Sequence, residues 1–375
     1  MINLYLFFIP LFTGIFSQTR TPVFESQTID DKVTIGYGLA LGDVDGDQKP
    51  DILLADKKQF VWYRNGDWKR FIMVENLTEG DNVCIAARDI DGDGKVEVAV
   101  GAQWVPSETT DTLKSGSVHY LIRPKDPTQL WTPVKLHHEP TVHRMKWVKT
   151  NVGYHLVVVP LHGRGNKNGE GEGVKILSYE MPKDPGKKWK YYIVDQSMHL
   201  THNFDIVPRG SSENICVGGK EGIKHFQFIN NKWEQLDANL GVKDKSFGEV
   251  RIANGFYAAI IPMHGNELSI HGSFASIVLL TDLNQGHALA TGDLMTSGND
   301  QIIVGWREPN KDKKVGIKIF VSEPGTTPTW KDYWVDDNGM ACEDLQLADL
   351  DGDGKKDIIA AGRSTHNLKI YWNKN

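Results

Sequence analysis

Repetition is the feature that most constrains the fold of this 375-residue chain. Four segments share one pattern: a short apolar run, an acidic and glycine-rich turn, and a second apolar run that ends in small residues. They are Leu39–Ala55, Ile85–Ala102, Ala288–Trp306 and Leu345–Gly362. This pattern predicts two β-strands joined by a tight turn. Three further segments keep the second apolar run but lack the acidic turn; these are His143–Pro160, His202–Gly218 and Gly248–Pro262.

The repeating unit is larger than two strands, because a third strand and an aromatic-rich fourth strand follow most copies. Four strands that recur at about 50 residues are typical of a propeller blade, and seven copies are present. The last copy stops after its third strand, at Asn375, whereas Pro22–Ile29 is an unattached strand near the N-terminus. The sequence therefore predicts an all-β, seven-bladed propeller of four-stranded blades, whose last blade is closed by the N-terminal strand.

The N-terminal segment predicts export. Residues 1–17 contain no Asp, Glu, Lys or Arg and are almost wholly apolar from Leu4 to Phe16. This run has the size of a signal-peptide core and is short for a membrane span. An N-terminal anchor is the alternative. We expect a signal peptide over 1–17, a propeller over 18–375, an exported location (periplasmic or secreted) and no membrane span in the mature chain.

Charge and cysteine content exclude other classes. The formal net charge is −6 and no basic run is present, which argues against a nucleic-acid partner. The three cysteines are too few and too scattered for a disulfide framework or a zinc ribbon.

The acidic turns predict structural cation sites. In three repeats, carboxylates alternate around a glycine and a further acid follows. Alternating carboxylates converge on a hard cation, so we expect Ca²⁺ or Mg²⁺ in each loop. Plain acidic hairpin turns are the alternative. The ligand candidates are Asp43, Asp45, Asp47 and Asp51; Asp89, Asp91, Asp93 and Glu97; and Asp349, Asp351, Asp353 and Asp357.

Alignment of the repeats gives two columns of residues on the opposite face. The first column, where the inner strand of each blade begins, is Tyr37, Val83, His143, His202, Gly248, His287 and Glu343. The second column, just past the second strand, is Lys57, Gln103, His162, Lys220, His264, Arg307 and Arg363. In a propeller both positions surround the mouth of the central channel. Such polar columns are not typical of a packed core.

Three neutral imidazoles and a carboxylate that converge on a channel suit Zn²⁺ or Mn²⁺. We assign this transition metal to His143, His202 and His287. The alternative is that each histidine caps a turn in its own blade. Arg307 and Arg363 could hold an oxyanion or a carboxylate, or could pair with Glu308 or Asp344. His138 lies in the loop before the third inner strand, close to the expected rim.

The segments 157–173 (VVVPLHGRGNKNGEGEG), 283–294 (LNQGHALATGDL) and 336–373 resemble secreted propellers with FG-GAP/VCBS repeats. The similarity is greatest to the N-terminal propeller of the aldos-2-ulose dehydratase (1,5-anhydro-D-fructose dehydratase) family. It extends over essentially the whole mature chain. In that family, cupin domains linked to an isomerisation step follow the propeller. The resemblance here covers the propeller alone, so we do not extend the isomerisation step to this chain.

The resemblance implies β-elimination of water from a 2-keto sugar, a carbohydrate-derived small molecule. This reaction needs a Lewis acid on the C2 carbonyl, a base near C3 and an acid for the departing hydroxyl. His162 and His264 are then the acid/base candidates, with Glu343 as a ligand or base. Arg307 and Arg363 would position the substrate and stabilise the enolate.

Two alternatives come from other classes. A propeller polysaccharide lyase would act on uronic acids and could use Lys57, Lys220 and Arg164 besides the two arginines. A non-catalytic carbohydrate- or protein-binding propeller would use only the ion loops, with Trp104, Trp306 and Tyr37 as aromatic platforms.

Overall fold

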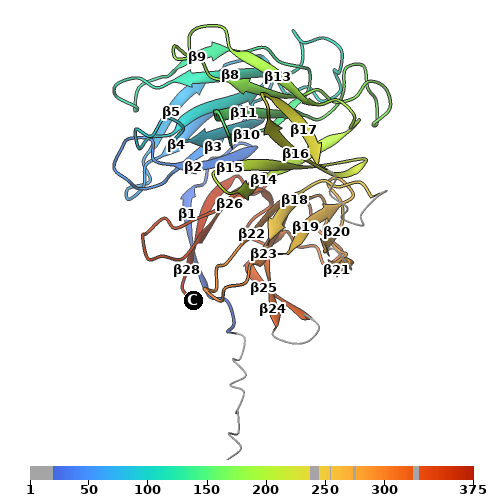
Figure 1. Ribbon diagram of the computed structural model, residues 1–375. Helices are drawn as coiled ribbons and strands as arrows, with labels where there is room; N and C mark the ends of the chain where they lie inside the picture. The colour runs from blue at the N-terminus through green and yellow to red at the C-terminus, as the bar shows by residue number, and fades with distance from the viewer. Residues whose placement is uncertain (1–19, 237–244, 254, 273–275, 324–328) are drawn as a thin grey trace, which may run out of the picture.

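Seven antiparallel sheets of four strands follow one another along the chain, one for each sequence repeat (Figure 1). The computed structural model describes residues 20–236, 245–253, 255–272, 276–323 and 329–375. The predicted signal peptide at 1–17 lies outside the described residues. Within them every named element is a strand, and none forms a helix long and apolar enough to cross a bilayer.

Each blade runs from an inner strand beside the central channel to an outer strand. Blades 1 to 3 contain β2 Gly38–Gly42, β3 Asp51–Ala55, β4 Gln59–Tyr63, β5 Arg70–Glu75, β6 Cys84–Arg88, β7 Glu97–Ala102, β8 Ser117–Ile122, β9 Thr132–Lys135, β10 Val142–Thr150, β11 Gly153–Pro160, β12 Ile176–Glu180 and β13 Lys190–Asp195. Blades 4 to 6 contain β14 Thr201–Arg209, β15 Ser212–Gly219, β16 Gly222–Ile229, β17 Lys232–Leu236, β18 Val250–Ala253, β19 Phe256–Ile261, β20 Glu267–His271, β21 Ser276–Leu280, β22 Gly286–Gly292, β23 Gln301–Trp306, β24 Gly316–Glu323 and β25 Thr329–Asp337.

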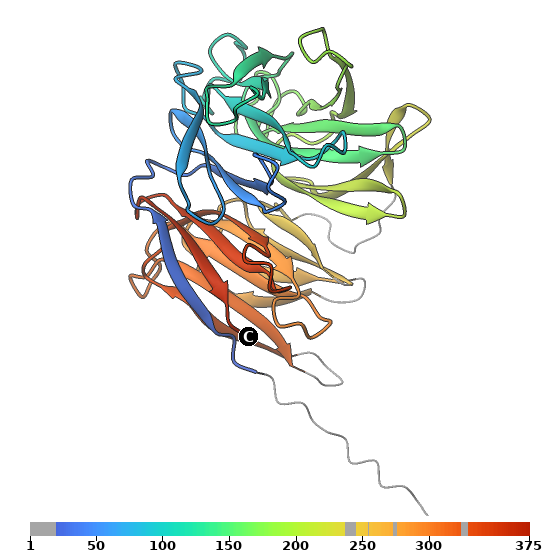
Figure 2. The same cartoon turned by 90° about the vertical axis from the view of Figure 1, so that its left-hand side faces the viewer.

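The seventh blade joins the two ends of the described chain. It contains β26 Cys342–Ala348, β27 Asp357–Gly362 and β28 Asn367–Asn373, and its outer strand is β1, Phe24–Asp30. β1 pairs antiparallel with β28, and Figure 2 shows the blue strand lying along the red blade. The inner strand β26 also contacts β2 of the first blade. The predicted seven-bladed ring with an N-terminal closing strand is therefore confirmed.

The core lies between neighbouring blades. The second strand of most blades is buried along its whole length, as in β3, β7, β23 and β27, because both faces of each sheet are covered. One apolar cluster joins Leu54 of blade 1 to Ile359 of blade 7, across the ring closure. Trp62, Trp147 and Trp306 are fully buried in such clusters. The prediction of Trp306 as a rim platform is therefore wrong, because its ring packs in the core.

Candidate metal centre

A β-bulge opens the inner strand of four blades, at the first-column position predicted from the repeats. In β10, Val142 pairs with Pro160 and the next pair is Arg144 with Val159, so His143 stands outside the ladder. A bulge frees one residue from pairing and turns its side chain to a new direction.

The same shift recurs in the other blades that carry a polar residue in this column. It leaves His287 unpaired in β22 and Glu343 unpaired in β26, and it occurs between Thr201 and Phe204 in β14, around His202. β2, β6 and β18 have no such shift at their first pairs. The bulges therefore direct the side chains of the first column toward the channel, namely His143, His202, His287 and Glu343.

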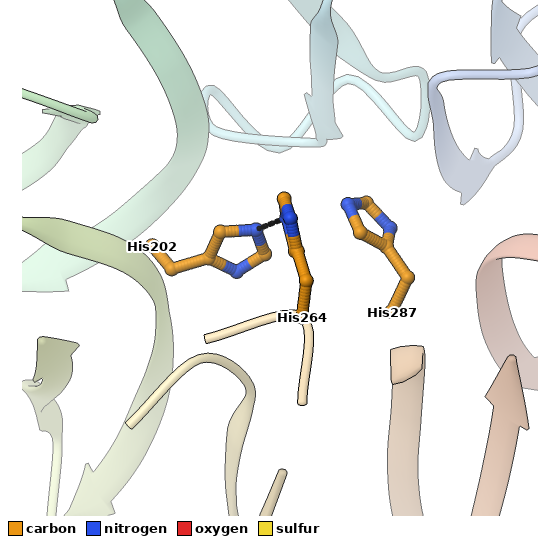
Figure 3. A group of neighbouring side chains, drawn as sticks. All are labelled: His202, His264 and His287. Carbon is orange, nitrogen blue, oxygen red and sulfur yellow. Dashed lines mark hydrogen bonds between the residues drawn. The ribbon is translucent and has the colours of Figure 1, made fainter. Parts of the chain in front are cut away.

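Three histidines from different blades meet at this end of the channel. His202, His264 and His287 bring one ligand nitrogen each to within 4.8 Å of one another, and Figure 3 shows the ring of His264 between those of His202 and His287. Nε2 of His202 lies 2.7 Å from Nε2 of His264. His202 and His287 are 1% and 4% exposed, whereas His264 is half-buried.

The outer nitrogens of two histidines lie beside oxygen atoms. Nδ1 of His287 is hydrogen-bonded to the main-chain oxygen of Glu343 at 2.6 Å, whereas Nδ1 of His202 lies 3.0 Å from a carboxylate oxygen of Glu249 without hydrogen-bond geometry. Glu249 is in turn held by Asn203, which donates at 2.7 Å, and by Arg251 at 3.0 Å. Such outer contacts orient metal-binding histidines and set their tautomer. They leave Nε2 of both rings for a ligand.

Burial keeps these rings neutral. It lowers the pKa of His202, His264 and His287, and the nearby charges of Arg144 and Arg307 lower each pKa further. Neutral imidazole is the form that binds a metal, so little proton release is needed.

The three nitrogens fit a transition ion. A tetrahedral Zn²⁺ with Zn–N distances of about 2.1 Å separates neighbouring nitrogens by about 3.4 Å. The nitrogens of His202 and His264, at 2.7 Å, need to move apart by about 0.7 Å to reach that spacing. Three nitrogen ligands leave a fourth position for a substrate or water.

The structure changes the predicted membership of this group. His143 lies next to His202, with ring centroids 4.7 Å apart, but falls outside the three-residue group. It stacks on Trp104 at 4.8 Å, and its buried Nε2 has no hydrogen-bond partner. His264, predicted as an acid/base residue, takes the ligand position instead. His264 lies in the turn that follows β19, and this turn is closed by a hydrogen bond from Gly265 N to Pro262 O at 2.7 Å.

Glu343 is tied to both second-column arginines. Arg307 and Arg363 donate to its carboxylate at 3.0 Å and 3.1 Å, and the glutamate is 1% exposed. The alternative that these arginines pair with Glu308 or Asp344 is therefore wrong. Both guanidinium groups occupy this carboxylate, so the contact fixes the side chains at the rim of the site.

The remaining predicted site residues lie apart. Nδ1 of His138 is 3.3 Å from the main-chain oxygen of Glu139, and His162 is half-buried beside Leu200. Among the described residues neither makes a hydrogen bond or ring contact with the three histidines. Arg164 pairs with Glu139 at 2.9 Å, and Lys220 donates to the main-chain oxygen of Gly169.

The acidic turns form compact groups at the other end of the inner strands. Ligand oxygens lie within 4.8 Å of one another in the groups Asp43–Asp45–Asp51, Asp89–Asp91–Glu97 and Asp349–Asp351–Asp353. The turns begin where β2, β6 and β26 end, whereas the histidines lie where inner strands begin. The two kinds of site are therefore at opposite ends of the channel, as predicted.

Three predicted loop ligands are outside these groups. Asp47 accepts from Lys49 N at 2.9 Å, and Asp93 pairs with Arg123 at 3.1 Å. Asp357 accepts from Leu350 N and Asn373 N, which hold the turn closed. Asp51, which belongs to the group in blade 1, accepts the same two kinds of main-chain contact as Asp357, from Val44 N and Asn65 N, so the prediction of these three residues as ligands stays a prediction.

A fourth turn shows how the loop closes without an acidic cluster. In blade 6, Gln301 Oε1 accepts from Leu294 N at 2.7 Å, as Glu97 Oε2 accepts from Ile90 N at 3.1 Å in blade 2. By contrast, burial and the neighbouring Asp91 raise the pKa of Glu97 to about 7. Burial and the neighbouring Asp45 likewise raise the pKa of Asp51 to about 7. These loops carry unfavourable negative charge that a cation would neutralise.

Comparison with known proteins supports the repeat type and the fold. The FG-GAP-like repeat family matches residues 43–100. The comparison with curated proteins finds no match. A crystal structure of BBS1N in complex with ARL6DN has a TM-score of 0.59 at 13% identity, covering 94% of this chain and 98% of that chain. The WD40 β-propeller domain of Doa1 has a TM-score of 0.55 at 11% identity, covering 93% and 96%. At these identities the likeness concerns the fold.

Proposed function

We propose that this propeller is a metal-dependent carbon–oxygen lyase that eliminates a β-substituent from an oxidised sugar. The observation that carries the proposal is the group of His202, His264 and His287, two of them buried and one half-buried, with one ring nitrogen of each within 4.8 Å of the others. The first candidate reaction is loss of water from a 2-keto sugar such as 1,5-anhydro-D-fructose. A bound Zn²⁺ or Mn²⁺ would supply Lewis acidity for the carbonyl oxygen.

His143 is the best acid/base candidate in this arrangement. Its unpartnered Nε2 lies beside the ligand His202, and its ring is held by the stack on Trp104. A neutral imidazole can accept the proton from the carbon next to the carbonyl. This role replaces the one predicted for His162 and His264, because His162 lies apart and His264 is a ligand.

The arginines supply positive charge at the rim. Arg307 and Arg363 share one carboxylate, that of Glu343, so the three groups together carry one net positive charge. Positive charge beside the carbonyl oxygen stabilises the enolate that forms when the neighbouring proton leaves. The side chain of Arg363 is 36% exposed and can contact an entering substrate.

A uronate lyase is the second candidate, and the excess positive charge around the histidines favours it. Uronate β-elimination uses the same steps, with a carboxylate in place of the ketone. A non-catalytic propeller with only structural cations is the remaining alternative, and it requires no transition metal.

Ca²⁺ or Mg²⁺ in the acidic turns is a separate part of the proposal. It is supported by the converging oxygens of the three groups and by Asp45 Oδ1, which is buried without a partner. Export of the chain stays a prediction from residues 1–17. N-terminal sequencing of the protein recovered outside the cytoplasm tests it.

Activity assays separate the candidates. Protein loaded with Zn²⁺ or Mn²⁺ is incubated with 1,5-anhydro-D-fructose, and separately with oligouronates, while the ultraviolet absorbance of the unsaturated product is followed. His287→Ala should abolish turnover, whereas the matched variant His366→Ala, at a surface histidine, should not. Turnover that survives in His287→Ala contradicts the metal mechanism. If the absorbance rises with oligouronates and not with 1,5-anhydro-D-fructose, the protein is a uronate lyase.

A further inference from the structure

A cavity of about 250 Å³ is lined by residues of the inner strands around the channel. Its lining includes the residue that follows each of three bulge positions: Arg144 after His143, Asn203 after His202 and Asp344 after Glu343. At about 30 Å³ per water, the volume corresponds to roughly eight waters. The cavity is large enough for a small ligand. None of the three histidines lines it, but Arg144 links it to them, because its guanidinium also contacts the ring of His143, which lies beside His202.

Most cations of this cavity are paired with a carboxylate. Arg88 pairs with Glu213 at 2.8 Å and Lys146 with Asp205 at 3.4 Å. Arg251 pairs with Glu249 at 3.0 Å. These pairs are internally neutral, so they give the cavity little net charge.

Arg144 is different. Its polar contacts among the described residues are both with His143: it donates to the main-chain oxygen at 3.0 Å and lies 3.4 Å from the ring Nδ1. No carboxylate of the described residues lies within 4.0 Å of it. The other unpaired charge in the lining is Asp344, whose oxygens accept from Leu39 N and Leu345 N. A guanidinium with free donors beside a metal centre is suited to bind a carboxylate.

We propose that Arg144 holds the carboxylate of a sugar acid whose adjoining carbon reaches the three-histidine centre. This inference rests on the proposed function, and it selects a carboxylated substrate over a neutral keto sugar. Asp344 in the same lining partly balances the charge of Arg144, but no carboxylate occupies the donors of its guanidinium, and the Arg307–Glu343–Arg363 group at the rim adds one net positive charge; this arrangement fits an anionic ligand. The fork of a guanidinium also fixes the orientation of a carboxylate.

Binding measurements test this without relying on turnover. Calorimetric titration of the zinc-loaded chain compares D-galacturonate, neutral D-galactose and inorganic phosphate. We expect wild-type protein to bind galacturonate at least about 10-fold more tightly than galactose. Arg144→Gln should weaken galacturonate binding about 10- to 100-fold and leave galactose unchanged. Arg144→Lys should be intermediate, and Arg209→Gln, at an exposed arginine, should match wild type.

Equal binding of the two sugars by wild type overturns the proposal, as does unchanged galacturonate binding in folded Arg144→Gln. Arg144-dependent binding of phosphate without binding of galacturonate also overturns it. If Arg144→Gln does not fold, the wild-type comparison of acid and neutral sugar decides. Arg144-dependent galacturonate binding by a chain that takes up no zinc supports the anion site and refutes the metal-dependent function.

Discussion

Replacing one buried loop carboxylate should stabilise the metal-free protein. Glu97 is 6% exposed and lies with Asp89 and Asp91 in the acidic turn of blade 2. Glu97→Gln keeps the oxygen that accepts from Ile90 N and removes the charge. Gln301 occupies the equivalent place in blade 6, where its amide also donates to Asn299 O at 2.6 Å. The substitution therefore has a precedent within the same chain.

The magnitude follows from the pKa of Glu97, which burial and Asp91 raise from 4.5 to about 7. The unfolded chain loses its proton first, so the carboxyl destabilises the fold progressively from pH 4.5 to 7 and fully above pH 7. The shift corresponds to at most about 3 kcal/mol, and solvent screening at the exposed turn reduces it to about 1–2 kcal/mol. For a chain of this length, an unfolding entropy of roughly 0.8 kcal/mol/K converts this to about 1–3 °C.

Thermal unfolding of wild type and Glu97→Gln in chelator measures this difference. At pH 8 the variant should melt about 1–3 °C higher, and at pH 4.5 the two should coincide. In millimolar calcium the order should reverse, because the wild-type loop gains a ligand that the variant lacks. A variant that melts lower than wild type at pH 8 in chelator, or an equal gain from calcium in both proteins, would refute the reasoning.

Three further predictions concern the histidines and the ring. Glu249→Gln should lower zinc affinity about 10- to 100-fold in a calorimetric titration, because it weakens the contact that orients His202; an unchanged affinity contradicts this role. His143→Gln should abolish turnover while zinc binding persists, and loss of both would make His143 a ligand. Deleting β1 should lower the melting temperature by several degrees relative to a chain that starts at Pro22, because the exposed edge of β28 loses its partner; equal melting temperatures would show that ring closure adds no stability.

The fold could be predicted because each blade repeats the same local chemistry. The acidic turn, the buried second strand and the small residues after it recur at a fixed spacing. In a ring of blades each copy of this pattern forms the same structural unit. The closing strand also followed from this count, because blade 7 lacked one strand that the N-terminal segment could supply. Only its bounds changed, from Pro22–Ile29 to Phe24–Asp30.

The site could be predicted in part. Alignment placed His202, His287 and Glu343 in one column, and the structure explains that column by a bulge in each blade. Alignment could not show that the turn after Pro262 carries His264 inward, since this depends on main-chain geometry. It also could not show that both arginines reach the same carboxylate, because side chains from neighbouring blades meet only in the folded ring.

The metal content of the purified protein tests the central claim most directly. Elemental analysis should find about one zinc or manganese per chain in addition to calcium, and His202→Ala, His264→Ala and His287→Ala should each lose it while His366→Ala retains it. A wild-type protein that holds no transition metal after incubation with zinc, or one whose zinc content is unchanged in all three variants, would contradict the account.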